Sequence, residues 1–306
     1  MPGFLCVLPL LCGLAGEPPG SAASQDARGP AVGFEVASVQ RIWNQAPHCA
    51  FTDLLKVDDR LYCAFREGDD HAGGRDGEIR IIVREGDGPW RSLALLAEEG
   101  VDLRDPKLAR MPDGRIMVTC GGSFYEERTL LKAETRIFFS DSEGRKFEGP
   151  EVAMIDERIR SSMDWLWRVT WHEGVGYGVV YQAGKEGSPI HLVKTLDGIH
   201  YAWICRMPLE GHPNETTLRF QEHDEMVALV RREAGDHTAC LGVAAPPYTS
   251  WSFTALPEAI GGPNLVALDE ENWILAGRRY LRDGPRTALF RYGPGQEWTV
   301  LTVLPS

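Results

Sequence analysis

The sequence has no apolar run long enough to span a bilayer and no regular cysteine pattern. Its longest apolar run, residues 4–15 (FLCVLPLLCGLA), is shorter than the ~20 residues that a membrane-spanning helix needs, so no membrane span is expected. The seven cysteines are scattered and contain no Cys-x-x-Cys pair, which argues against a zinc site and against a disulfide framework. We therefore expect no metal and no other cofactor.

The sequence also lacks an excess of positive charge. It has 32 Lys and Arg residues against 44 Asp and Glu residues, which gives a net charge of −12. Nucleic acid binding needs a basic face that neutralises phosphates. Nucleic acid is therefore not an expected partner, and the acidity is interpreted as a contribution to solubility.

The N-terminal segment has some features of a signal peptide and lacks one of them. The apolar run 4–15 has a suitable length, and residues 18–24 contain small residues suited to cleavage, but no Lys or Arg precedes the run. Residues 1–30 are predicted to be a signal peptide with a disordered N-terminus, and the protein to be secreted or periplasmic. The alternative is a disordered N-terminus on a cytoplasmic protein. No linker-like stretch interrupts residues 35–306, which are predicted to form one domain.

Helical periodicity is nearly absent, and short strand-like runs dominate. Runs such as 61–65, 78–83, 115–119 and 226–230 are rich in β-branched and aromatic residues and are bounded by Gly, Asp or Pro. A turn followed by an aromatic residue recurs about every 50 residues. It reads DGPW at 87–90, SDSEGRKF at 140–147 and TLDGIHY at 195–201, with looser forms at 246–251 and 293–298.

A strand-rich repeat of this period is typical of a β-propeller, in which each repeat forms one four-stranded blade. We predict a propeller with five recognisable blades and a sixth, which the segment before residue 90 or sequence beyond residue 306 would supply. The alternative is a β-sandwich with unrelated hairpins. Loops from all blades of a propeller meet at one end of its central channel, so the site is expected to combine residues that are far apart in the sequence.

The turns resemble the Asp-box of the sialidase superfamily, Ser-x-Asp-x-Gly-x-x-Trp. The segment 140–147 fits it with Ser142 in place of Asp and Phe147 in place of Trp, and 195–201 fits a shortened form. The resemblance covers about residues 45–306 and implies an all-β, six-bladed propeller of sialidase type. Asp-boxes also occur in other propellers, so they indicate fold and not chemistry.

The resemblance extends to segments that carry function in sialidases, which hold a substrate carboxylate with three arginines. They also use an Asp as acid/base and a Tyr–Glu pair as nucleophile. The segment 64–79 looks like the one with the acid/base, which places Asp76 in that role, and 214–217 looks like the one with the Glu, which is Glu215. Arg231 and Arg278 stand where the second and third arginines are expected.

Two departures from the family pattern concern the chemistry. Thr52 replaces the first arginine, and Arg66 on the next strand is the candidate substitute. No Tyr stands where the nucleophile is expected, because the sequence stops at Ser306 and Tyr280 is too close to Arg278. The resemblance therefore implies a chain truncated before its nucleophile, and we expect a weak or inactive hydrolase.

The residues themselves support a site for an acidic sugar. Guanidinium groups recognise carboxylates in a bidentate manner, and Arg66, Arg231 and Arg278 each end an apolar strand. We predict that they converge with Glu215 near the channel mouth, although strand alternation leaves open whether Arg232 and Arg279 face inward instead. Surface salt bridges are the alternative for these arginines. Further candidates for the site are His71, Arg168, and Arg104 with Asp105, for which a structural Arg–Asp pair is the alternative. Trp165 and Trp167 are interpreted as an aromatic platform or as blade packing.

The leading hypothesis is a sialidase-like glycoside hydrolase that acts on a terminal acidic sugar. One alternative is a carbohydrate-binding propeller that keeps the arginines and has lost the chemistry. Another is a propeller that serves as a scaffold for protein interactions. The sequence does not identify the sugar, the linkage or the oligomeric state.

Overall fold

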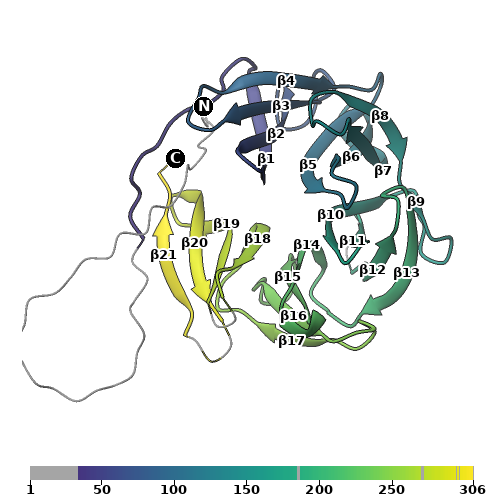
Figure 1. Cartoon of the computed structure of the whole chain (residues 1–306). Helices are drawn as coiled ribbons and strands as arrows, with labels where there is room; N and C mark the ends of the chain where they lie inside the picture. The colour runs from purple at the N-terminus through teal and green to yellow at the C-terminus, as the bar shows by residue number, and fades with distance from the viewer. Residues whose placement is uncertain (1–33, 185–186, 270–271, 294, 296, 306) are drawn as a thin grey trace, which may run out of the picture.

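The computed structural model describes residues 34–184, 187–269, 272–293, 295 and 297–305, and it confirms the all-β propeller (Figure 1). The described strands form five blades, one fewer than the six expected. The predicted signal peptide, residues 1–30, lies outside the described residues. Nothing helical in the described part of the chain has the length and apolar character needed to cross a membrane.

Each blade is an antiparallel sheet whose strands run in sequence order from the channel outward. Blade 1 contains β1 (His48–Val57), β2 (Arg60–Gly68), β3 (Glu78–Glu85) and β4 (Arg91–Leu96). Blade 2 contains β5 (Asp102–Arg110), β6 (Ile116–Glu126), β7 (Thr129–Ser140) and β8 (Phe147–Val152). Blade 3 contains β10 (Asp164–His172), β11 (Val175–Gln182), β12 (Ile190–Thr195) and β13 (His200–Met207), and β9 (Met154–Ile155) pairs with β13 in parallel.

The last two blades follow the same order. Blade 4 contains β14 (Pro213–Phe220), β15 (Met226–Arg232), β16 (Cys240–Ala244) and β17 (Ser252–Ala255), with the 3-10 turn η1 (Glu222–Asp224) between β14 and β15. Blade 5 contains β18 (Gly261–Ala267), β19 (Trp273–Leu281), β20 (Gly284–Tyr292) and β21 (Thr299–Val303).

The recurring turn joins the two outer strands of a blade. In blade 3 the carboxylate of Asp197 accepts hydrogen bonds from the backbone N–H groups of Ile199 and His200, both at 2.8 Å. Gly198 has φ +81°, a conformation that glycine adopts without strain. The hydroxyl of the closing Tyr201 donates to Gly198 O at 2.8 Å, and its ring is buried. The turn and the aromatic residue therefore act as one unit that closes the outer edge of the blade.

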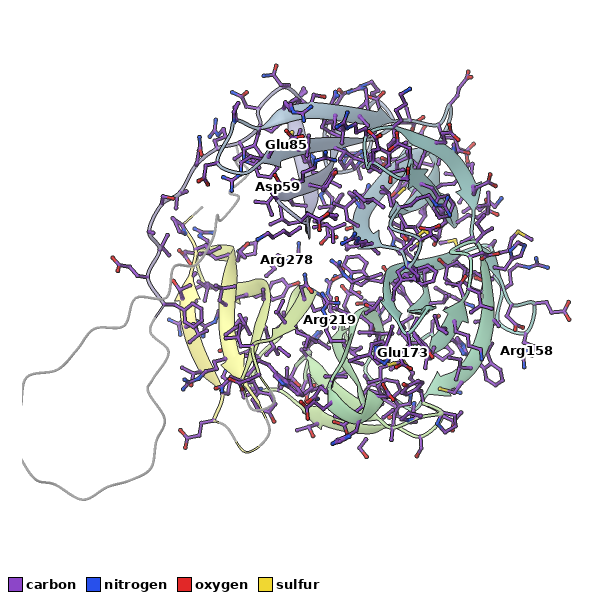
Figure 2. The ribbon with its side chains drawn as sticks, viewed as in Figure 1. Asp59, Glu85, Arg158, Glu173, Arg219 and Arg278 are labelled. Carbon is purple, nitrogen blue, oxygen red and sulfur yellow. The ribbon has the colours of Figure 1, made fainter. Side chains whose placement is uncertain are left out.

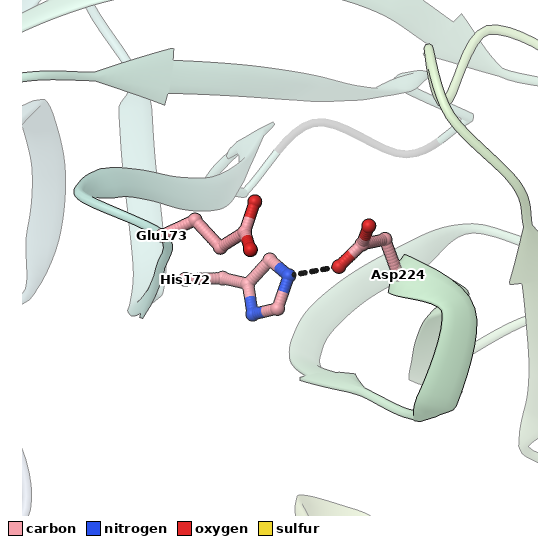
Figure 3. A group of neighbouring side chains, drawn as sticks. All are labelled: His172, Glu173 and Asp224. Carbon is pink, nitrogen blue, oxygen red and sulfur yellow. Dashed lines mark hydrogen bonds and ion pairs between the residues drawn. The ribbon is translucent and has the colours of Figure 1, made fainter.

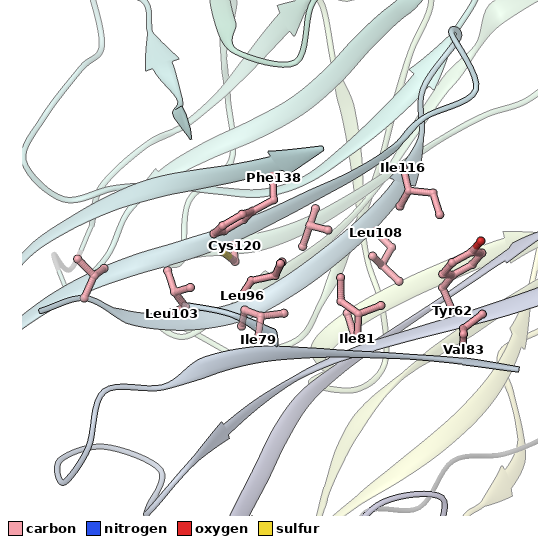
Figure 4. Close-up of a cluster of buried hydrophobic side chains, with 13 residues drawn as sticks. Tyr62, Ile79, Ile81, Val83, Leu96, Leu103, Leu108, Ile116, Cys120 and Phe138 are labelled. Atoms are coloured by element: carbon pink, nitrogen blue, oxygen red, sulfur yellow. The ribbon is translucent and has the colours of Figure 1, made fainter. Parts of the chain in front are cut away.

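The core consists of apolar layers between successive blades. Between blades 1 and 2, Ile79 and Ile81 pack against Leu103, Leu108 and Phe138 (Figure 4). Equivalent clusters lie between blades 2 and 3, 3 and 4, and 4 and 5. Burial of these side chains supplies the main favourable term for a sheet fold of this kind.

Among the described residues, no apolar cluster joins blade 5 to blade 1, so the two blades are the ends of an open ring. The free face of blade 1 is covered by the chain that precedes it, where Trp43 packs on Phe65 with ring centroids 6.0 Å apart. The free face of blade 5 leaves Val266 and Tyr280 half exposed, at 53% and 50%.

Candidate functional site

A cavity of about 1100 Å³ lies at one end of the channel, where the innermost strand of every blade begins. All five blades contribute to its lining. The lining residues come from segments spread along the chain between His48 and Pro305. This agrees with the expectation that distant parts of the sequence meet at one end of the propeller.

Five β-bulges build the cavity wall. The register of the innermost strand shifts once in each blade, and every shift lies near the start of its strand: 50–53 in β1, 104–107 in β5, 166–169 in β10, 213–216 in β14 and 261–264 in β18. A bulge releases two residues from regular pairing and turns their side chains away from the ladder. The residues released are Phe51 and Thr52, Asp105 and Pro106, Trp167 and Arg168, Asn214 and Glu215, and Gly262 and Pro263, and all but Pro106 line the cavity.

Seven of the nine predicted site residues line this cavity: His71, Arg104, Asp105, Arg168, Glu215, Arg231 and Arg278. Arg66 and Asp76 do not line it. Of the two arginine pairs that the sequence left open, Arg231 and Arg278 face the cavity. Arg232 instead donates to Thr238 O, and Arg279 forms an ion pair with Glu258.

Arg66 is fully buried, and its guanidinium group bonds to other residues of the protein. Its Nε donates to Asp102 Oδ1 at 2.7 Å and its Nη1 donates to Asp70 O at 2.9 Å. Asp102 also accepts the backbone N–H of Gly77 at 2.8 Å. Because a charge without solvent access is stabilised only by such partners, this arrangement assigns Arg66 to holding the 68–77 loop and not to contacting a ligand.

Replacing Gly77 with Ala should destabilise the fold by about 1–3 kcal/mol, the usual cost of overpacking a filled interior. A Cβ at this position would lie 2.1 Å from Arg66 Nε and 2.3 Å from Asp102 Oδ1, so it would separate the buried pair. The measurement is the urea midpoint of unfolding. Asp76→Ala is the matched control, since Asp76 is exposed in the same loop. An unchanged midpoint for the Gly77 variant would contradict the packing described.

Asp105 is the carboxyl group of the cavity that has no hydrogen-bond or ion-pair partner among the described residues. Its backbone adopts φ +49° within the β5 bulge, a conformation that is unusual for residues other than glycine. Burial raises the pKa of Asp105, and the nearby charge of Glu215 adds to the shift against the opposing effect of Lys107. A carboxylic acid that keeps its proton above the usual range is suited to donate it.

Glu215 is held in the opposite manner. Its Oε1 lies 2.7 Å from Arg231 Nη1, and its Oε2 accepts the backbone N–H of Gly262 at 2.7 Å. Both groups donate to the carboxylate and fix its position, which suits the negative charge of Glu215 to stabilise positive charge on a ligand. Arg231 also contacts Glu233, so this arginine is shared between two acids.

The floor of the cavity is a buried ionic group that joins blades 1, 2 and 3. Asp53 of β1 accepts from Arg168 of β10 at 2.6 and 3.1 Å, and both side chains are at least nine-tenths buried. Burial opposes ionisation of Asp53, but Arg168 outweighs it and lowers the pKa of Asp53. Lys107 of β5 lies 4.0 Å from the centre of the Trp167 ring, and burial lowers the pKa of its amine.

Arg278 and Arg104 are the arginines best placed to meet a ligand. Figure 2 shows Arg278 of blade 5 directed toward the centre of the ring, and its only described hydrogen bond runs from Nε to the Tyr280 hydroxyl at 3.3 Å. Arg104 donates to His71 O at 2.9 Å and lies 5.0 Å from the centre of the Phe51 ring. Burial lowers the pKa of the His71 imidazole, and the Arg104 charge adds to the shift.

Sequence reasoning missed Tyr181, the last-but-one residue of β11. Its ring stacks on Trp165 with centroids 6.4 Å apart and lines the cavity. Burial raises the pKa of its hydroxyl well above the usual range, and the Glu215 carboxylate contributes to the shift. The end of an apolar strand adjoining a Gly-containing loop, as in Tyr181-Gln182-Ala183-Gly184, was the available signal. Asp53 and His48 also line the cavity and were not assigned to the site from the sequence.

Comparisons with known proteins identify the architecture. No protein-family model matches the sequence, and no curated protein matches it. A protein of unknown function from Dyadobacter fermentans DSM 18053 superposes with a TM-score of 0.71 at 14% identity, over 83% of each chain. The two proteins therefore share the propeller fold.

Two similar structures are enzymes. The exo-β-1,3-galactanase 1,3Gal43A from Clostridium thermocellum gives a TM-score of 0.60 at 12% identity over 83% of this chain and 61% of its own. The Trypanosoma rangeli sialidase gives 0.60 at 9% identity over 87% of this chain and 50% of its own. The present chain thus spans about half of that sialidase, and at these identities the likeness extends to the fold alone.

Proposed function

We propose that this protein is a glycoside hydrolase whose cavity binds a terminal sugar bearing a carboxylate. One observation carries the proposal: separate bulges bring Asp105 and Glu215 into one cavity that Arg104, Arg231 and Arg278 also line. Most glycosidases need two carboxyl groups in different protonation states. Among the proteins of similar fold, several are named as glycosidases, which supports this class and leaves the sugar open.

The arginines define the kind of sugar. Arg278 has no acidic partner among the described residues and lines the same cavity as Arg104. An anionic substrate would supply the missing countercharge through bidentate hydrogen bonds. Tyr181, Trp165 and Phe51 also line this cavity, and their aromatic rings offer apolar faces for a sugar ring.

The two carboxyl groups take different roles. Asp105 is the proton donor to the departing oxygen, in place of the exposed Asp76 that the family resemblance assigned. Glu215 stabilises the positive charge that develops on the sugar or takes a proton from Tyr181, the cavity tyrosine. Tyr181 is our candidate for the nucleophile that the sequence did not locate.

A second function, binding without turnover, is favoured by one observation. Both oxygens of Glu215 are occupied by Arg231 and Gly262, and the described residues include no hydrogen bond from Tyr181 to Glu215. A phenol whose pKa is raised by burial is a weak nucleophile until a base accepts its proton. The same cavity would then serve as a lectin-like site for acidic sugars.

The deciding experiment measures turnover and binding in parallel. Purified protein is assayed on a fluorogenic sialoside, and binding of free N-acetylneuraminic acid and of galactose is measured by calorimetry. Slow turnover that Glu215→Ala abolishes supports the hydrolase, whereas binding without turnover supports the second function. Turnover that persists in Glu215→Ala contradicts the assignment of Glu215, and absence of binding to any acidic sugar favours a protein scaffold.

Arg278→Ala should weaken binding of the free acid sugar by about tenfold or more, because a charge-assisted hydrogen bond contributes about 1.5–3 kcal/mol. Binding of a neutral sugar should change much less. The matched control is Arg282→Ala, an exposed arginine of blade 5 that does not line the cavity. Equal affinities of the Arg278 variant and the wild type for the acid sugar would remove Arg278 from the site.

A further inference from the structure

A second cluster of potential ligands lies at the opposite end of the propeller from the cavity. His172 ends β10 and Glu173 begins the following hairpin, while Asp224 ends the η1 turn between β14 and β15 (Figure 3). The first residues of β10 and β14 line the cavity, so the last residues of these strands lie at the other end. The cluster therefore joins blades 3 and 4 and has no part in the proposed hydrolysis.

The three side chains present their ligand atoms to one point. One nitrogen of His172 and one carboxylate oxygen each of Glu173 and Asp224 lie within 4.8 Å of one another. His172 Nε2 is 2.8 Å from Asp224 Oδ1. Figure 3 shows the Glu173 carboxylate near the edge of the imidazole that faces Asp224. Tetrahedral bonds of about 2.0–2.2 Å from one ion place two ligand atoms about 3.4 Å apart. Binding would therefore separate His172 Nε2 and Asp224 Oδ1 slightly and shift the exposed Glu173 carboxylate.

The surroundings hold two of the ligands in place. The His172 ring stacks on Phe220 with centroids 3.9 Å apart and an interplanar angle of 7°, which sets the direction of Nε2. The Tyr248 hydroxyl donates to the backbone oxygen of Asp224 at 3.0 Å and anchors the η1 turn. Such support for first ligands is typical of metal sites, where it orients the imidazole and the carboxylates.

We propose that His172, Glu173 and Asp224 bind a divalent transition-metal ion, best matched by Zn²⁺, which links blades 3 and 4. An imidazole with two carboxylates suits zinc and its neighbours, whereas Ca²⁺ and Mg²⁺ prefer oxygen ligands alone. The ion takes the place of the proton shared between His172 Nε2 and Asp224 Oδ1. Three protein ligands leave a fourth position for water.

The test uses ZnCl₂ as the probe and the purified chain without an affinity tag. Calorimetry and thermal melting in the presence and absence of Zn²⁺ should show binding to the wild type and a rise in melting temperature. His172→Phe keeps a ring against Phe220 and removes the nitrogen, so it should weaken the affinity about tenfold or more. Glu173→Gln removes a ligand on an exposed hairpin and should weaken it as well.

The matched control is His200→Ala. His200 Nδ1 lies 2.7 Å from Asp197 Oδ2 in another exposed hairpin, but this pair is not part of a described three-ligand group. This variant should bind Zn²⁺ like the wild type. Melting in EDTA shows whether His172→Phe remains folded. Wild-type affinity in both His172→Phe and Glu173→Gln, or no Zn²⁺ binding by the wild type up to about 1 mM, would overturn the proposal.

Discussion

Asp105→Asn is expected to lower the turnover number by about 10²–10⁴-fold, the usual contribution of a positioned proton donor. Asn has nearly the same shape but no proton to give to the departing oxygen. Binding of the free acid sugar should change only slightly, because Arg104 and Arg278 remain. The loss should be larger for a sialoside with an alkyl leaving group than for one with a methylumbelliferyl group, which departs with little protonation.

The matched control is Asp76→Asn, which changes an exposed carboxylate that does not line the cavity. Its turnover should equal that of the wild type. The pH dependence gives a further check on Asp105. Since burial raises the pKa of Asp105, the wild type should keep its activity above the usual carboxyl range and lose it as the pH rises through that raised value. A large loss in Asp76→Asn and none in Asp105→Asn would restore the assignment made from the family resemblance.

Arg168→Ala should destabilise the fold by about 3–5 kcal/mol, the typical cost of removing one partner of a buried ion pair. Asp53 is only 5% exposed, and in this variant its carboxylate would lose both hydrogen bonds from Arg168. Because Arg168 lowers the pKa of Asp53, this pair contributes stability above the ordinary carboxyl pKa of 3.8 and loses it as the pH falls through the lowered value. Urea unfolding at neutral pH and at pH near 3 measures both effects.

Two further variants test whether the destabilisation by Arg168→Ala arises from the burial of the ion pair. The double variant Asp53→Asn with Arg168→Met removes both charges and should recover part of the lost stability. Arg158→Ala breaks the ion pair with Asp156 at the rim of the ring, where the arginine is exposed, and should hardly change the midpoint. A midpoint for Arg168→Ala equal to that of Arg158→Ala would contradict a structural role for the buried pair.

The repeat could be predicted from the sequence because each unit is local. Hairpin turns, β-branched runs and closing aromatics lie within a few residues of one another, so their spacing predicts the blades. The five recognisable blades are confirmed, and the described residues contain no sixth. Trp90 closes the turn before β4, so the segment before it is the first blade itself and leaves no separate sixth blade among the described residues.

The site was harder to predict because it depends on register. A bulge shifts a strand by one residue, and no residue type marks where it must occur. The arginine at the end of β2 therefore appeared equivalent to those at the ends of β15 and β19. Only the packing of Arg66 against Asp102 and Gly77 separates it from Arg231 and Arg278. Asp105 and Arg168 were found among the candidates, but the buried partner of Arg168 is 115 residues away.

The open ring has a mechanical consequence for ligand entry. In a closed ring of blades the diameter can change only if an interface breaks, because every rotation must be compensated elsewhere. In the part of the chain that the structure describes, four apolar interfaces join five blades, and the faces of blades 1 and 5 share no apolar cluster. Small rotations at the four interfaces add up at the free ends. The distance between Arg278 on blade 5 and Asp53 on blade 1 is thus the softest dimension of the cavity, and a bound sugar that contacts both ends would stiffen the whole ring.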